Sequence, residues 1–227
     1  MLYELRIYQP GGGRMADMEV LMARDCTEVL RRAKMPRPLG AWRAVAGPRL
    51  PAFLWILAWD SMAERNAAWA AFGADIQWQQ LRLAAHTQTE LTVRVDTEFM
   101  AAWPEIAPEQ GADLSPTGGV YQLLVHRVKT GMGAAFKKAF LDADRAVIEE
   151  CDGRVVVGFD FLSGEDLPVS AVLVRWPDMA RHAIGAAAYD SHPKLKAERI
   201  AERARYGCDV FLSVDRYLME SSLSFGK

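Results

Sequence analysis

The stretch that decides the fold is YELRIY at residues 3–8, which is followed by the glycine run GGG at residues 11–13. The pattern returns as YQLLVH at residues 121–126, followed by a second turn that ends at Gly131. Three further matches keep the same order along the chain: LP at 50–51 with 167–168, W followed by MA at 59–63 with 176–180, and VD at 95–96 with 214–215. The offset between matching positions stays between 117 and 119, which predicts two copies of one structural unit.

A segment without periodic apolar residues separates the two copies. Residues 103–118 are rich in Pro, Gly and polar side chains, which is typical of a linker. We therefore expect a first domain at residues 1–102, a linker at 103–118 and a second, diverged domain at 119–227. Each domain has the usual size of a small folding unit.

Within each copy, strand-like and helical patterns alternate. The strand-like runs are 2–8, 41–46, 52–59 and 87–99 in the first copy, and 120–127, 154–161, 169–176 and 209–219 in the second. Amphipathic helical stretches lie after the first and third strand of each copy. The resulting order, β-α-β-β-α-β, predicts an α+β fold of two tandem ferredoxin-like units, each with two helices on one face of a four-stranded antiparallel sheet.

The open face of each sheet needs a cover or must be solvated. Because one chain holds two such units, the economical solution is that the two sheets cover each other. The space between them would then be a lumen with contributions from both copies. We expect any site of this protein to lie there.

Composition excludes several classes of protein. With 51% hydrophobic and 25% charged residues, the 227-residue chain is typical of a soluble globular protein. The 27 Lys and Arg residues are balanced by 29 Asp and Glu residues, so no basic field is available for nucleic acid. The longest apolar run, residues 52–59, is far shorter than the roughly 20 residues of a membrane span. The charged start of the chain is unlike a signal peptide, which favours a cytoplasmic location.

Alternation along the strands sorts the first-copy residues onto two faces. Leu5 and Ile7 are predicted to face the helices, which leaves Glu4, Arg6 and Tyr8 on the lumen side. Further polar side chains are predicted on that lumen side in the last strand of the first copy and in the second copy: His86, Glu90, Arg94 and His126. An alternative interpretation is that these charges form cross-strand ion pairs on a solvated sheet. Aromatic walls at Trp42 and Trp55 favour the lumen.

These residue types suggest proton or oxygen chemistry on a bound organic molecule. Arginines would hold an anionic or enolate oxygen, and these are Arg6 and Arg94. A carboxylate or imidazole would move a proton, the candidates being Glu4, Glu90 and His86. The remaining side chains would bind the substrate by hydrogen bonds or stacking, namely Tyr8, Trp42, Trp55 and His126. Cofactor-free oxygenation needs only deprotonation of the substrate and exclusion of water.

Motifs for fixed cofactors are missing from the sequence. There is no dinucleotide, phosphate-loop or zincin motif, and the four histidines have no paired ligand spacing, so we expect no metal and no cofactor. A haem would need an axial histidine such as His126, and this stays open as an alternative. The three cysteines lack a CxxC spacing and are interpreted as buried or idle thiols.

The YELRIY motif with its glycine turn, WDSMAER at residues 59–65 and DIQW at residues 75–78 together resemble the NIPSNAP family. The second copy is similar but diverged, with QLL in place of ELR and DSHP in place of DIQW. The resemblance implies a dimeric α/β-barrel, in which two ferredoxin-like sheets pair within or between chains, and a homo-oligomer is expected. Related barrels include cofactor-independent monooxygenases, haem-dependent enzymes, isomerases and lyases, whereas other members of the family have no established reaction.

Two hypotheses follow for the function. In the first, the protein is a small-molecule enzyme without a fixed cofactor that acts on an anionic or enolisable substrate in the barrel lumen. In the second, it is a non-catalytic binding or assembly protein with the same fold. A lumen cavity lined by Arg6 and Arg94 favours the enzyme, and a lumen filled by side chains favours the binding protein.

Overall fold

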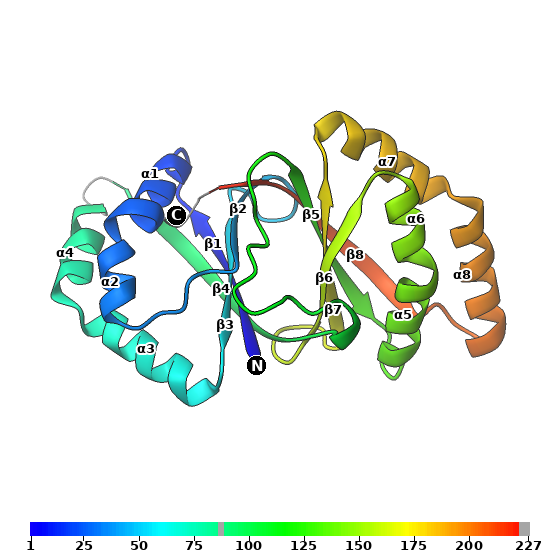
Figure 1. Cartoon of the computed structure of the whole chain (residues 1–227), viewed down its shortest axis with the longest axis horizontal. Coiled ribbons are helices and arrows are strands. Elements are labelled where there is room, and N and C mark those ends of the chain that lie inside the picture. Colours follow the sequence, from blue (N-terminus) through cyan, green and yellow to red (C-terminus); the bar gives the residue numbers. More distant parts are fainter. Residues whose placement is uncertain (86–88, 223–227) are drawn as a thin grey trace.

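Eight antiparallel strands close into a barrel in the computed structural model, which describes residues 1–85 and 89–222. The strands follow the order β1-β3-β2-β8-β5-β7-β6-β4 around the barrel. The helices form two layers outside it, one at each end of the long axis in Figure 1. No helix of the described residues is long and apolar enough to span a bilayer.

The first half of the chain supplies four neighbouring strands and one helix layer. Its strands are β1 (Leu2–Pro10), β2 (Gly40–Ala46), β3 (Phe53–Trp59) and β4 (Thr92–Ala102). Its helices are α1 (Met15–Val20), which runs through a π-helical turn (Leu21–Asp25) into α2 (Thr27–Arg32), followed by α3 (Met62–Ala74) and α4 (Ile76–Ala85). The strand β1 pairs with both β3 and β4, which places it in the middle of this half.

The second half repeats this arrangement. Its strands are β5 (Val120–Val128), β6 (Arg154–Phe161), β7 (Val169–Trp176) and β8 (Phe211–Ser221). Its helices are α5 (Gly133–Ala139), a π-helical turn (Phe140–Asp144), α6 (Arg145–Glu150), α7 (Met179–Ser191) and α8 (Pro193–Tyr206). The strand β5 pairs with β7 and β8, as β1 does with β3 and β4.

Two strand pairings join the halves and close the barrel within one chain. The C-terminal strand β8 pairs with β2, and β4 pairs with β6. The predicted α+β barrel of paired antiparallel sheets is therefore confirmed in its coarse form, a mixed fold with a closed eight-stranded barrel. The division into two ferredoxin-like units stays a prediction.

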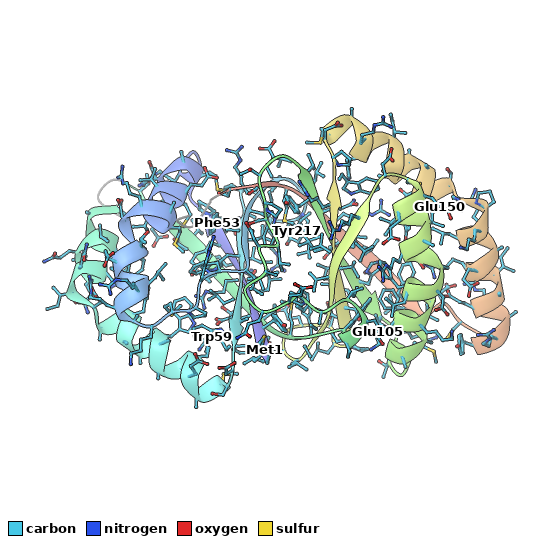
Figure 2. All side chains as sticks on the ribbon, in the orientation of Figure 1. Met1, Phe53, Trp59, Glu105, Glu150 and Tyr217 are labelled. Atoms are coloured by element: carbon cyan, nitrogen blue, oxygen red, sulfur yellow. The ribbon has the colours of Figure 1, made fainter. Side chains whose placement is uncertain are left out.

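The barrel interior is packed with apolar side chains from both halves. Leu5, Trp42, Tyr121, Leu173 and Tyr217 belong to this cluster and are all buried. Tyr217 lies between the two halves in Figure 2. Apolar side chains therefore occupy the interior, and a cavity of about 540 Å³ lies at one mouth of the barrel, where residues of both halves line it together with Arg94.

The predicted assignment of the β1 faces is wrong. Leu5 and Ile7 pack into the barrel interior, whereas Glu4, Arg6 and Tyr8 face the helices. The physical reason is that a closed interior has neither water nor partners for a charge, so it takes the uncharged set of side chains. The helix layer supplies those partners and leaves an opening to solvent.

The linker packs against the barrel. Trp103 is buried against Gly158, where an added Cβ would lie 2.4 Å from the indole ring. Leu114 packs into the interior cluster, and the Ser115 hydroxyl accepts a hydrogen bond from the Ala41 backbone N–H at 3.1 Å. Proline and glycine thus mark an irregular but packed connection rather than a loose one.

Candidate functional site

A cavity of about 400 Å³ lies between the first-half sheet and its helices. Its floor is formed by β1 and β3, and its walls by α1 with the following π-helical turn, α3 and α4. The polar side chains of the lining are Arg6, Tyr8, Arg82 and Thr92. Most of the remaining surface is apolar or aromatic and comes from Met18, Leu21, Met22, Trp55, Trp69, Phe72, Trp78, Leu91 and Val95.

Beside this cavity, the side chain of Glu4 is completely buried and fully bonded. Its Oε1 accepts hydrogen bonds from Arg6 Nη1 at 2.9 Å and Arg65 Nη2 at 2.8 Å. Its Oε2 accepts from the indole of Trp59 at 2.8 Å, from Arg65 Nε at 3.2 Å and from the indole of Trp69 at 3.2 Å. One carboxylate therefore holds two guanidinium groups, and the cluster keeps an excess positive charge.

Arg6 is fixed in a single orientation by this cluster. Its Nε donates to the Tyr8 hydroxyl at 3.0 Å, and its Cζ lies 4.1 Å from the centre of the Trp69 ring, a cation–π contact. Its Nη2 has no hydrogen-bond partner among the described residues, and 13% of the side chain is exposed. The free guanidinium edge thus belongs to a residue that lines the cavity.

Two pKa shifts in the cluster have opposite directions. Burial raises the pKa of Glu4, but the hydrogen bonds from Arg65, Arg6 and Trp69 outweigh it and hold the pKa below its ordinary value. Burial also raises the pKa of Tyr8, against the neighbouring charge of Arg6. Glu4 is consequently a carboxylate, and Tyr8 keeps its proton as a hydrogen-bond donor.

The structure brings together only part of the predicted site. Arg6, Tyr8 and Trp55 line the cavity, and Glu4 positions Arg6 from the side. Trp42 lies in the barrel interior, where it makes an edge contact with Tyr121 at 5.9 Å, whereas Arg6 faces the helices, so the two do not line one cavity.

The remaining predicted residues lie elsewhere. Arg94 is at one mouth of the barrel and pairs with Asp96 at 2.6 Å, and Glu90 is exposed before β4. His86 lies outside the described residues. His126 faces the second helix layer instead of a shared lumen. The predicted pair of Arg6 and Arg94 around one ligand is therefore wrong, because the two arginines belong to different cavities.

Several residues of the site were not predicted from the sequence. Arg65 and Trp69 lie one turn apart on α3 and reach Glu4, and Phe72 and Trp78 complete the aromatic wall. The spacing of Arg65, Trp69 and Phe72 along one helix face was the available signal, because three large or charged side chains facing a sheet need partners there.

Among residues 1–85 and 89–222, no three His, Cys, Asp or Glu side chains lie together as a metal site would require.

Comparison with known proteins adds a family and a fold. The NIPSNAP family model matches residues 3–105. No curated protein matches the sequence closely enough to count as a relative. A protein from Lactobacillus acidophilus NCFM, provisionally named a monooxygenase, is 8% identical with a TM-score of 0.58, covering 99% of this chain and 96% of that one.

Two further structures are similar. An anthrone oxidase-like protein is 13% identical with a TM-score of 0.57, over 100% of this chain and 94% of that chain. An uncharacterized NIPSNAP domain protein from Burkholderia xenovorans is 20% identical with a TM-score of 0.41, over 48% of this chain and 100% of its own. The two structures that match the whole chain are similar to it in fold alone. The similarity to the NIPSNAP family model therefore covers residues 3–105, which are less than half of the chain.

Proposed function

We propose that the cavity between the first-half sheet and its helices binds an anionic or enolisable organic molecule, whose oxygen is held by Arg6 and Tyr8. The observation that carries this proposal is the buried Glu4 cluster, which fixes two guanidinium groups with one carboxylate. The volume of about 400 Å³ is in the range of small-molecule sites. The aromatic lining suits a planar, largely apolar ligand body.

The same geometry supports chemistry on an enolate without a resident cofactor. Arg6 would stabilise the negative oxygen, which lowers the pKa of the bound substrate and favours its enolate form. The enolate carbon would then reduce dioxygen and form a peroxide on that carbon. With an anthrone as substrate, loss of water from this peroxide yields the quinone, so each ketone consumes one O2 and releases one water. The names of the anthrone oxidase-like and monooxygenase neighbours make this the reaction to test first.

A non-catalytic binding role is the second candidate, and the state of the titratable groups favours it. The hydrogen bonds of Glu4 are all used in holding arginines and tryptophans, and Tyr8 has a raised pKa. Glu4 is therefore a positioning residue rather than a proton acceptor. The substrate proton would have to leave to solvent or to a residue outside the described ranges, and a stable anion would simply stay bound.

The two halves of the chain share features that are consistent with duplication of one unit. The π-helical turns at Leu21–Asp25 and Phe140–Asp144 and the central positions of β1 and β5 occur at matching places. We propose two tandem ferredoxin-like units on this basis, of which the first is the one with the Arg6 cavity.

The experiment is an oxygen-uptake assay with anthrone, run together with calorimetric binding of 1-naphthoate. We expect Arg6→Met to abolish the O2 uptake and to weaken 1-naphthoate binding about ten-fold or more, the equivalent of one lost charge-assisted hydrogen bond. Arg94→Met is the matched control, and both measurements should stay at the wild-type level. Binding without O2 uptake in the wild type would select the non-catalytic role. Equal 1-naphthoate binding by wild type and Arg6→Met would refute the site.

A further inference from the structure

The second half of the chain holds a cavity of its own, at the place that corresponds to the Arg6 cavity. It has a volume of about 530 Å³ and lies between the second-half sheet, α7 and α8. Its floor is formed by residues that lie 118 positions after those of the Arg6 cavity: Leu124 corresponds to Arg6, and His126 corresponds to Tyr8. The cation of the first cavity floor is thus replaced by an aliphatic side chain.

The floor also carries polar groups, among them His126 and Gln122 of β5. His126 is 5% exposed, and its Nδ1 is buried without a hydrogen-bond partner among the described residues. Its ring packs against Phe136 and Phe211 at centroid distances of 4.8 and 5.4 Å. Burial, reinforced by the charges of Arg199 and Arg216, lowers the pKa of His126 to about 3, so the imidazole is neutral near pH 7.

The two arginines around the cavity are each paired with carboxylates of the protein. Arg199 donates to Asp144 and, at 2.9 Å, to Glu202, and Arg216 donates to both oxygens of Asp190 at 2.8 and 3.0 Å. The remaining cation of the lining, Lys196, is on the exposed face of α8. Unlike the Glu4 cluster, this network leaves no buried guanidinium in excess.

We propose that the His126 cavity is a second ligand site, which takes an uncharged, largely apolar organic molecule with a hydroxyl group. A hydroxyl both donates and accepts a hydrogen bond, so it can satisfy the unpartnered imidazole in either neutral tautomer. A buried nitrogen without a partner is unfavourable, so the site favours a ligand that brings a hydroxyl within reach of the ring. An anion gains little here, because Arg199 and Arg216 are already paired with carboxylates and the imidazole carries no charge. This site is independent of the function proposed for the first cavity.

The experiment compares 1-naphthol with 1-naphthoate, two probes that share a ring system and differ in charge at pH 7. Calorimetry on the whole protein should show 1-naphthol binding that His126→Phe weakens about ten-fold or more, the loss of one hydrogen bond to a buried group. The same variant should bind 1-naphthoate as the wild type does, whereas Arg6→Met should lose 1-naphthoate and keep 1-naphthol. This crossed pattern separates failure of one site from failure of the other.

A second measurement does not depend on the variant folding. In the wild type, 1-naphthol should shift the imidazole nitrogen resonances of His126 and leave those of His182, which lies outside the cavity lining, unchanged. Unshifted His126 resonances at saturating 1-naphthol, or no 1-naphthol binding at all, would overturn the proposal. Equal affinity of wild type and folded His126→Phe for 1-naphthol would do the same.

Discussion

At the scale of single residues, Glu4 is the side chain on which the first cavity depends. Removing its charge leaves Arg6 and Arg65 facing each other in a largely buried cluster. We expect Glu4→Gln to lower the free energy of unfolding by about 3 kcal/mol, which is typical when one partner of a buried ion pair is lost. Urea denaturation measures the change.

The matched control for this substitution is Glu28→Gln, because Glu28 pairs with Arg31 on an exposed helix face. Exposed pairs contribute about 0–1 kcal/mol, so this variant should be close to wild type. Equal effects of the two substitutions would mean that Glu4 is not the centre of the cluster.

The buried His126 makes the protein sensitive to mild acid. Its pKa is about 3 in the folded state and near 6.5 when unfolded, so between these values only the unfolded chain binds the proton. Stability contributed by neutral His126 is therefore complete above pH 6.5 and declines as the pH falls toward 3. At pH 5 the loss should be about 2 kcal/mol.

His126→Phe tests this prediction by urea denaturation at pH 7.5 and pH 5. The free energy of unfolding should fall between pH 7.5 and pH 5 by about 2 kcal/mol less in the variant than in the wild type. Glu4 does not disturb the comparison, because its lowered pKa confines its titration to pH values below the ordinary range of a glutamate. If this fall is the same in the variant and the wild type, His126 binds its proton in the folded protein as readily as in the unfolded chain.

The sequence predicted the identity of several site residues but not the face on which they lie. Alternation along β1 separates Glu4, Arg6 and Tyr8 from Leu5 and Ile7 correctly, since period two is a property of the strand itself. Which set points to the helices depends on partners in the distant α3, and alternation carries no information on them. Arg65 and Trp69 decide the matter by bonding Glu4.

At the scale of elements, α3 carries both partners of Glu4 and is anchored at its first turn. The Ser61 hydroxyl accepts the Glu64 backbone N–H at 3.1 Å, and the Glu64 carboxylate accepts the Asp60 N–H at 2.9 Å. Ser61→Ala should cost about 1 kcal/mol of stability, the usual value of an N-cap. Thermal unfolding measures it, and Ser61→Asp, which keeps a capping oxygen, should restore it. A Ser61→Ala protein that unfolds at the same temperature as the wild type would contradict the role of this cap.

The ends of several elements were predicted correctly where a residue type such as proline marks them. The strands 154–161 and 169–176 and the Pro193 start of α8 were predicted as observed. The π-helical turns were not, because one extra residue within a turn changes the apolar spacing too little to be read from the pattern. The predicted last strand of the first half began at residue 87, whereas β4 begins at Thr92.

At the scale of the whole molecule, stability comes from the filled barrel interior that both halves share. Leu5 is 2% exposed and belongs to the interior cluster with Tyr121 and Leu173 of the second half. Leu5→Ala should lower the free energy of unfolding by about 2–5 kcal/mol, the range for cavities in a packed core. Val93→Ala is the control, since that side chain is exposed on β4. If Leu5→Ala lowers the free energy of unfolding by no more than Val93→Ala does, Leu5 does not belong to the core.

The barrel itself was predictable, but its use was not. Two copies of a sheet with one uncovered face favour mutual covering, and the strands β2–β8 and β4–β6 provide it. The sequence could not show how far side chains fill the space between the sheets, because filling depends on the summed volumes of Trp42, Tyr121 and Tyr217 across the two halves. A cavity of about 540 Å³ stays open at one mouth of the barrel. The two cavities that we propose as ligand sites lie instead under the two helix layers.

The central claim is that the Arg6 cavity under the helices, and not the barrel interior, holds an anionic ligand. A crystal structure of the protein with bound 1-naphthoate tests it most directly. The carboxylate should accept hydrogen bonds from Arg6 and Tyr8, with the ring system against the apolar lining of this cavity. A carboxylate held at the barrel mouth by Arg94, or a ligand among the interior side chains, would contradict the account.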